Sequence, residues 1–249
     1  MAVLTMEGDT DLNLGMVGQE LYDRLIEYRD DPELWCAVVT GAGTRAFSAG
    51  GNIKERADRD RTGAAPPGGD FWAAKPLTLI SGVEFWKPVV AAINGHCIGA
   101  GMMLAMACDI RITADHATFG IPEVKLGFPP GGGALFRLPR MLALGPAMEI
   151  VLTGERISAE QAYHWGLVNK VVPGEKVLDE AMGLAGKIAA NPPLAVRATK
   201  ELMIRGLELT FDQHLRLQQT LSAICLKTED AREGSQAFTE RRPGNFKGR

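Results

Sequence analysis

Apolar residues form short uninterrupted runs in the first half of the chain and helix-like periodic patterns in the second half. The runs at 35–40 and Val89–Ile93 are short and rich in valine, alanine and isoleucine, which indicates buried strands. Segment 18–29 repeats its apolar residues every three or four positions and predicts an amphipathic helix that ends near Asp31-Pro32. Alternating strands and helices predict an α/β domain.

Further strands are expected at 3–6 and 109–113, and a helix at 71–85. Segment 57–69 contains Gly63, Pro66 and Pro67 among many charges and is expected to be a mobile loop. Helical patterns dominate from residue 133 onward, with helices expected at 133–144, 146–153, 159–165, 174–190, 194–205, 211–226 and 230–240. The pair Ser158 and Gln161 fits a capping box at the start of one of them.

Composition narrows the class of protein. The chain has 249 residues, 46% hydrophobic and 23% charged, with a net charge of −3, so we expect a globular protein without a basic nucleic-acid face. Four cysteines lie far apart and are expected to be reduced thiols of a cytoplasmic protein; they are Cys36, Cys97, Cys108 and Cys225. The apolar stretch 88–106 is interrupted by Asn94, His96 and glycines, which favours a buried strand–turn–helix over a membrane span.

Two clusters of small residues carry the candidate chemistry. One lies within 46–54 (Ala-Phe-Ser-Ala-Gly-Gly-Asn-Ile-Lys), and the other within 94–101 (Asn-Gly-His-Cys-Ile-Gly-Ala-Gly). Small residues let backbone N–H groups approach a ligand closely. Two such clusters can hold one carbonyl oxygen from two sides, which is what an oxyanion hole requires.

A third glycine motif has a simpler interpretation. Gly41-Ala42-Gly43-Thr44-Arg45-Ala46 matches the G-x-G-x-x-[GA] dinucleotide fingerprint, and Asp60 follows at a suitable spacing. That fingerprint must open a helix at once, whereas Phe47 and the second glycine run follow here. We therefore expect a strand-to-loop turn without a nicotinamide site.

Several motifs in the right order resemble the crotonase superfamily, also called the enoyl-CoA hydratase/isomerase family. The resemblance covers nearly the whole chain. Its motifs are 12–14 (Leu-Asn-Leu), 46–54, the 88–109 segment that ends in Cys-Asp, the 119–137 segment with its Pro-Glu, 149–168, and the C-terminal 237–242.

The resemblance implies a spiral of β-β-α turns over residues 1–190, which would hold the acyl-CoA site. Residues 191–249 would form a helical C-terminal part of the same structural domain, with trimer contacts. It further implies a homotrimer or a dimer of trimers, an acyl-CoA thioester substrate, and coenzyme A only as part of that substrate. Neither a metal nor a separate cofactor is implied, and neither a nucleic acid nor a membrane is an expected partner.

The same resemblance assigns candidate roles. The two oxyanion N–H groups match Ala49 and Ala100, and Glu123 after Pro122 matches a catalytic glutamate of the family. The second glutamate of the family's hydratases matches Met103, which cannot exchange a proton and is expected to line the acyl pocket. The expected substrate contacts are Ser48, Gly50, Gly51, Asn52, Ile53, Gly99, Met103, Phe128 and Trp72.

With Glu123 as the single acid/base, several reactions remain open. One is an enoyl-CoA isomerase that moves a proton through the thioester enolate. Another is an enoyl-CoA hydratase in which one glutamate suffices. A decarboxylase or hydrolase of a specialised acyl-CoA and a non-catalytic acyl-CoA-binding protein are the alternatives. The acyl group itself is not encoded in any motif of the chain.

Overall fold

The computed structural model describes residues 1–8, 10–62 and 85–249. Its centre is a five-stranded, all-parallel sheet in the order β1-β2-β4-β6-β9. Every residue of β2 and β4 is buried, as expected for parallel strands that are covered on both faces. The strands are β1 (Ala2–Met6), β2 (Ala37–Gly41), β4 (Val89–Ile93), β6 (Ile110–Ala114) and β9 (Lys170–Val172).

A smaller sheet lies beside the first. Its strands β3 (Ala46–Ser48), β5 (His96–Ile98) and β7 (Thr118–Gly120) run parallel, and β8 (Ile157–Ser158) joins antiparallel to β7. Along the chain, β2 is followed by β3, β4 by β5 and β6 by β7, so each turn gives one strand to each sheet. A helix follows each pair: α2 (Ile53–Thr62), α3 (Ala100–Ala107), and η1 (Pro122–Leu126) with α4 (Ala134–Met141). The expected spiral of β-β-α turns is confirmed.

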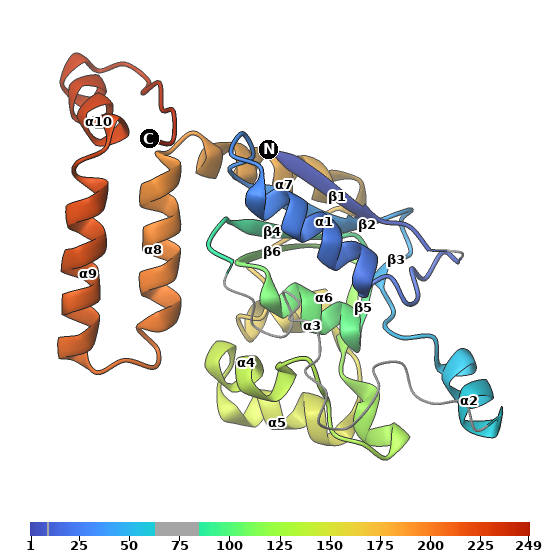
Figure 1. Ribbon diagram of the computed structural model, residues 1–249. Coiled ribbons are helices and arrows are strands. Elements are labelled where there is room, and N and C mark those ends of the chain that lie inside the picture. The colour runs from blue at the N-terminus through green and yellow to red at the C-terminus, as the bar shows by residue number, and fades with distance from the viewer. Residues whose placement is uncertain (9, 63–84) are drawn as a thin grey trace.

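Helices pack on the large sheet through regularly spaced apolar residues. Helix α7 (Val177–Ala189) buries Val177, Ala181 and Ala185, spaced one turn apart, and contacts β2, β4 and β6. Helix α1 (Gln19–Asp30) lies next to β1, and α3 lies against the small sheet (Figure 1). The buried face of α3 is nearly continuous, because glycine, alanine, methionine and leucine fill its eight positions.

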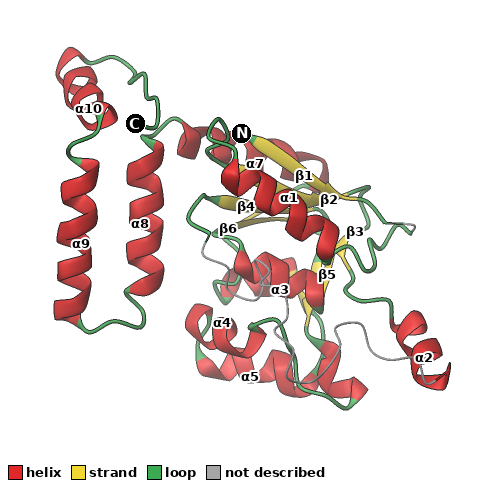
Figure 2. Cartoon of the chain, viewed as in Figure 1, coloured by secondary structure: helices red, strands yellow, loops and turns green. Residues whose placement is uncertain are grey.

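The second half of the chain is mainly helical. After α5 (Leu144–Thr153), Ser158 caps helix α6 (Ala159–His164). Its hydroxyl accepts the N–H of Gln161, which is one of the two hydrogen bonds of the predicted capping box. The turn η2 (Gly174–Lys176) leads into α7. Helices α8 (Pro193–Arg205), α9 (Phe211–Cys225) and α10 (Glu229–Glu240) follow, and α8 and α9 stand side by side away from both sheets (Figures 1 and 2).

The structure differs in part from the secondary structure that the sequence predicts. Residues 57–62, expected to be a loop, belong to helix α2, because the chain from Ile53 to Thr62 is made of residues that tolerate a helix and contains no glycine or proline. The rest of that segment, and the expected helix at 71–85 except for the buried Phe85, lie outside the described residues. The short strands β3, β5, β7, β8 and β9 were missed, because two or three residues give no periodicity.

Within the described residues, no helix has the length and apolar character to cross a membrane. The four cysteines are free thiols, and only Cys225 on α9 is partly exposed.

Candidate active site

Three parallel strands end at the same edge of the small sheet. Strand β3 pairs with β5, Ser48 lying opposite Cys97, and β5 pairs with β7, Ile98 lying opposite Gly120. The carboxyl ends of parallel strands are where open α/β sheets bind ligands. The pairing therefore brings together three segments that are distant in sequence, namely 49–51, 99–100 and 121–123.

The two small-residue clusters are in direct backbone contact at this edge. Gly50 has a φ of +90° and Gly99 a φ of +55°, conformations that favour glycine. A Cβ atom added to Gly50 would lie 3.0 Å from the carbonyl oxygen of Ile98 and 3.4 Å from the amide nitrogen of Ala100. The small residues are required because no side chain fits between these two backbones.

Ala49 does not present the free N–H that was expected of it. Its N–H donates to the carbonyl oxygen of Leu12 at 2.9 Å, so the prediction that Ala49 is an oxyanion donor is wrong. The N–H of Gly15 likewise donates to the carbonyl oxygen of Gly50 at 2.8 Å. The segment that contains the early Leu-Asn-Leu motif thus forms backbone hydrogen bonds with the first cluster. Sequence spacing did not predict this long-range pairing.

Gly51 and Ala100 offer their N–H groups instead. Neither group donates to an acceptor within the described part of the chain. Ala100 is the first residue of α3, where an amide has no intrahelical partner and where the helix dipole favours negative charge. Sequence reasoning counted Gly51 only as a substrate contact. Its position directly after Gly50, the residue with positive φ, is the signal that distinguishes it.

Glu123 reaches the same place from η1. A Cβ added to Gly99 would lie 3.1 Å from Oε1 of Glu123, so the carboxyl group lies against the second cluster. Oε2 of Glu123 is buried and has no hydrogen-bond partner among the described residues. Burial raises the pKa of Glu123 above its ordinary value. A half-buried carboxyl group with a raised pKa, and with a buried oxygen that has no hydrogen-bond partner among the described residues, is suited to proton transfer.

Met103 lies one helical turn after Gly99. Its N–H donates to the carbonyl oxygen of Gly99 at 3.0 Å, and its side chain is buried in the hydrophobic core. A thioether at this position adds apolar surface and no titratable group.

The remaining predicted contacts have different surroundings. The buried hydroxyl of Ser48 donates to the carbonyl oxygen of Asn13 at 3.0 Å and accepts the N–H of Gly50 at 3.3 Å, so this side chain stabilises the local backbone.

The other predicted contacts lie after the first cluster and after η1. Asn52 and Phe128 are half-buried, and Ile53 is exposed at the start of α2. Trp72 lies outside the described residues.

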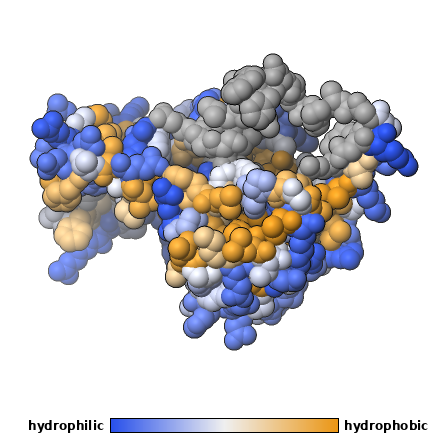
Figure 3. Space-filling view, turned by 90° about the horizontal axis from the view of Figure 1, so that it is seen from below, coloured by the Kyte–Doolittle hydropathy of each residue, from blue (hydrophilic) through white to orange (hydrophobic). Residues whose placement is uncertain are grey.

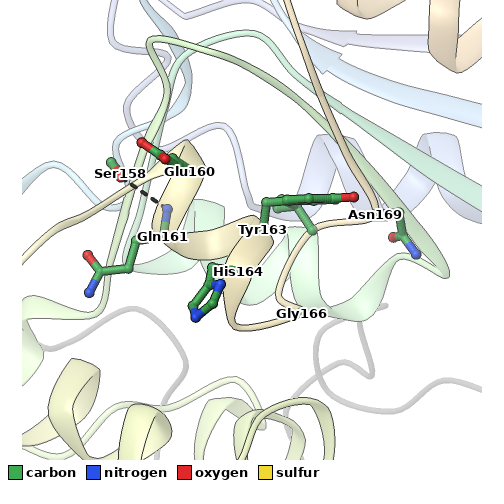
Figure 4. A pocket seen from close by; sticks show the side chains of 8 residues that line it. Ser158, Glu160, Gln161, Tyr163, His164, Gly166 and Asn169 are labelled. Carbon is green, nitrogen blue, oxygen red and sulfur yellow. Dashed lines mark hydrogen bonds between the residues drawn. The ribbon is translucent and has the colours of Figure 1, made fainter.

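Two other surface features contain none of the predicted site residues. Figure 4 shows an open hollow beside α6 that is lined by Ser158, Tyr163, His164 and their neighbours, and none of the predicted site residues lines it. Figure 3, which views the side where α4 and α5 lie, shows apolar residues gathered on that face. The exposed apolar side chains of these two helices are Leu135, Phe136, Leu144, Met148 and Leu152.

Comparison with known proteins agrees with this architecture over almost the whole chain. A family model described as enoyl-CoA hydratase/isomerase matches residues 11–249. A carnitinyl-CoA dehydratase from Salmonella arizonae is 39% identical over 230 residues, which cover 91% of this chain and 86% of the relative. A carnitinyl-CoA dehydratase from Proteus mirabilis is 38% identical over 234 residues, covering 92% and 88%.

Solved structures give the same result. The enoyl-CoA hydratase from Bacillus anthracis superposes with a TM-score of 0.86 at 33% identity, covering 99% of this chain and 96% of that one. An enoyl-CoA hydratase from Mycobacterium marinum gives 0.87 at 34% identity, covering 99% and 95%. The family model, the relatives and the fold all coincide with the motifs that carry the predicted site. This chain belongs to the enoyl-CoA hydratase/isomerase family of the crotonase superfamily.

Proposed function

We propose that this enzyme moves a proton on an enoyl-CoA thioester through an enolate, with Glu123 as its single acid/base, and that its reaction is enoyl-CoA isomerisation. One observation carries the proposal. The half-buried carboxyl group of Glu123, whose buried Oε2 has no hydrogen-bond partner among the described residues, lies beside the backbone that carries the N–H groups of Gly51 and Ala100. Met103 stands in place of a second carboxylate.

The oxyanion hole is proposed to form between Gly51 and Ala100. Both N–H groups would donate to the thioester oxygen, and the amino end of α3 would stabilise the negative charge that develops there. Gly50 permits this arrangement, since its missing Cβ leaves room beside the amide of Ala100. Asn52 and Ile53, at the start of α2, are the proposed contacts for the coenzyme A portion.

Glu123 is proposed to transfer the proton. As a carboxylate it removes a proton from C2 of a 3-enoyl-CoA, and the electron pair moves into the thioester carbonyl to give a dienolate. The protonated Glu123 then returns the proton to C4, and the double bond lies between C2 and C3. Atoms and charge balance without water, which suits a site with one carboxyl group.

Hydration or dehydration is the second candidate. The relatives named carnitinyl-CoA dehydratase are up to 39% identical to this chain, and this similarity favours a reaction that adds or removes water at C3. In that case the single Glu123 would both hold the water and exchange the proton. Decarboxylation or hydrolysis of a specialised acyl-CoA, and acyl-CoA binding without turnover, remain further alternatives.

Assembly into a homotrimer or a dimer of trimers is part of the proposal. Helices α8–α10 and the connections between them carry large apolar side chains that this chain leaves exposed, and α9 has no buried residue. They include Met203, Leu207, Phe211, Ile224, Leu226 and Phe238. Sedimentation equilibrium tests this, and a stable monomer at micromolar concentration would contradict it.

The chemistry is tested with wild type and Glu123→Gln on 3-enoyl-, 2-enoyl-, carnitinyl- and aryl-acyl-CoA. We expect 3-enoyl-CoA to be the best substrate and the variant to lose about 10²–10⁴ in turnover with acyl-CoA binding little changed. Exchange of the C2 protons of a saturated acyl-CoA in D₂O, followed by NMR, detects enolate formation whatever the final product. A variant within a few-fold of wild type in every assay would reject Glu123 as the acid/base.

A further inference from the structure

The turn that carries Glu123 has little internal support. η1 is a single 3₁₀ turn of five residues, and none of its residues is fully buried. Val124 and Leu126 are exposed apolar residues. Something outside the turn must therefore fix the position of the carboxyl group.

The connection between α5 and β8 lies directly against this turn. Gly154 ends α5 in the left-handed region, with a φ of +62°, and is buried. A Cβ added to Gly154 would lie 3.1 Å from Cγ and 3.2 Å from Cε of Lys125, and 3.2 Å from Cγ1 of Val124. The aliphatic part of the Lys125 side chain therefore lies across the backbone of Gly154, and a methyl group there would displace the side chains of Lys125 and Val124 by a few tenths of an ångström.

The same connection supports the chain on the other side of Glu123. A Cβ added to Gly120 would lie 3.3 Å from Cγ of Arg156 and 3.5 Å from the carbonyl oxygen of Glu155. Residues 154–156, the backing segment, thus contact the chain both before and after the catalytic glutamate. The pairing of β7 with β8 fixes the backing segment in turn.

An ion pair continues the contact. Nζ of Lys125 lies 2.6 Å from Oε1 of Glu155, with side-chain exposures of 46% and 74%. Exposed ion pairs are weak, because water competes for both charges. The apolar contact of the Lys125 side chain with Gly154 is therefore the stronger part of the support.

We propose that Gly154 and the aliphatic part of Lys125 are positioning residues, which set the distance of the Glu123 carboxyl group from Gly99 and thereby from the substrate. The inference rests on the proposed role of Glu123. The carboxyl group of Glu123 has little room to move toward Gly99, because its Oε1 already lies 3.1 Å from the position that a Cβ atom on Gly99 would take. A shift of η1 changes this approach, and misplacement of a catalytic group by about 1 Å lowers rate by about 10²-fold.

The first test compares Gly154→Ala with Gly166→Ala. Both glycines have positive φ, +62° and +85°, so both variants carry backbone strain, but a Cβ on Gly166 meets nothing within 4 Å. We expect Gly154→Ala to lose about tenfold in kcat with KM unchanged, and Gly166→Ala to keep the kcat of wild type. Equal kcat values in the two variants would overturn the proposal.

A second pair of variants avoids backbone strain. Lys125→Met keeps an unbranched chain over Gly154 and removes the charge, whereas Lys125→Ala removes both. We expect Lys125→Met within about twofold of wild type and Lys125→Ala about tenfold lower in kcat. A loss in Lys125→Met as large as that in Lys125→Ala would assign the effect to the ion pair and overturn the proposal.

A measurement without turnover separates this inference from the proposed function. The pKa of Glu123 is read from the carboxyl ¹³C resonance of glutamate-labelled protein, assigned by its disappearance in Glu123→Gln. We expect the pKa to fall toward its ordinary value in Gly154→Ala and Lys125→Ala, and to stay raised in Gly166→Ala and Lys125→Met. Unchanged pKa values in all four would reject the positioning role, whereas full activity of Glu123→Gln would reject the function and leave the titration result standing.

Discussion

The carboxyl group of Glu123 lies against the backbone of Gly99, and a Cβ atom at Gly99 would come within 3.1 Å of Oε1 of Glu123. The two residues follow the carboxyl ends of adjacent parallel strands, Gly99 after β5 and Glu123 after β7. The N–H of Gly99 donates to the carbonyl oxygen of Gly120 at 2.9 Å. This pairing places the proposed acid/base beside the amino end of α3. The proposed chemistry depends on that juxtaposition.

Glu123→Gln is expected to be more stable than wild type at neutral pH. Burial raises the pKa of Glu123 in the folded state, so the folded state binds its proton more tightly than the unfolded chain. The free energy of unfolding of wild type then decreases as the pH rises through the raised pKa, because the folded state must hold a buried carboxylate. Glutamine lacks this titration, so the advantage of the variant should grow as the pH rises above the ordinary glutamate pKa of about 4.3, and it should become constant above the raised pKa of Glu123.

Urea unfolding of both proteins across that range measures the difference. Glu155→Gln is a matched control, because the pKa of exposed Glu155 is lowered by Lys125 and its dependence has the opposite sign. A pH-independent difference between Glu123→Gln and wild type would contradict the burial of this carboxyl group.

Ala100→Pro removes one proposed oxyanion donor and leaves the residue in a helix. Ala100 is the first residue of α3, a position where proline is well tolerated because the N–H has no intrahelical partner. We expect a loss of about 10²–10³ in turnover with little change in thermal stability. Ala100→Gly keeps the N–H and should stay close to wild type. If the proline variant folds and keeps its turnover, Ala100 is not a donor.

Met103→Glu should raise the rate of water addition to a 2-enoyl-CoA relative to wild type. The new carboxyl group would lie one turn after Gly99 on α3, where the family's hydratases have their second glutamate. Burial of a carboxylate at a position that is 6% exposed is expected to lower stability, so thermal unfolding is measured in parallel. Met103→Gln is the uncharged control. If Met103→Glu folds but its rate of water addition does not rise, the shape of the pocket limits hydration.

Gly101→Ala should damage the fold at the site. A Cβ on Gly101 would lie 2.2 Å from the carbonyl oxygen of Ser48, so α3 and β3 would have to separate. We expect a loss of about 3 kcal/mol or more in the free energy of unfolding. Gly183→Ala on α7, where a Cβ meets nothing within 4 Å, should instead gain up to about 1 kcal/mol. Denaturant titration distinguishes the two, and equal stabilities would contradict the close approach at Gly101.

The sequence predicted most long elements well. The apolar run Val89–Ile93 is strand β4 with the same bounds, and the periodic C-terminal half gives helices α4 to α10. Local patterns suffice for such elements, because their burial repeats at fixed intervals along the chain. The motif around Pro122 and Glu123 likewise singled out the carboxyl group that the structure places against Gly99.

The tertiary structure decided which amides are available and what holds Glu123 in place. Ala49 and Gly51 are both small residues of one cluster, and only the pairing of Ala49 with Leu12 shows that the N–H of Ala49 is already used. The contact of Gly154 with Lys125 joins residues that no motif connects. Hydrogen bonds and close approaches between distant segments depend on how strands pair in space, and sequence periodicity carries no information about that. The sequence by itself therefore determined the residue types of the site, and the packing of the two sheets determined their roles.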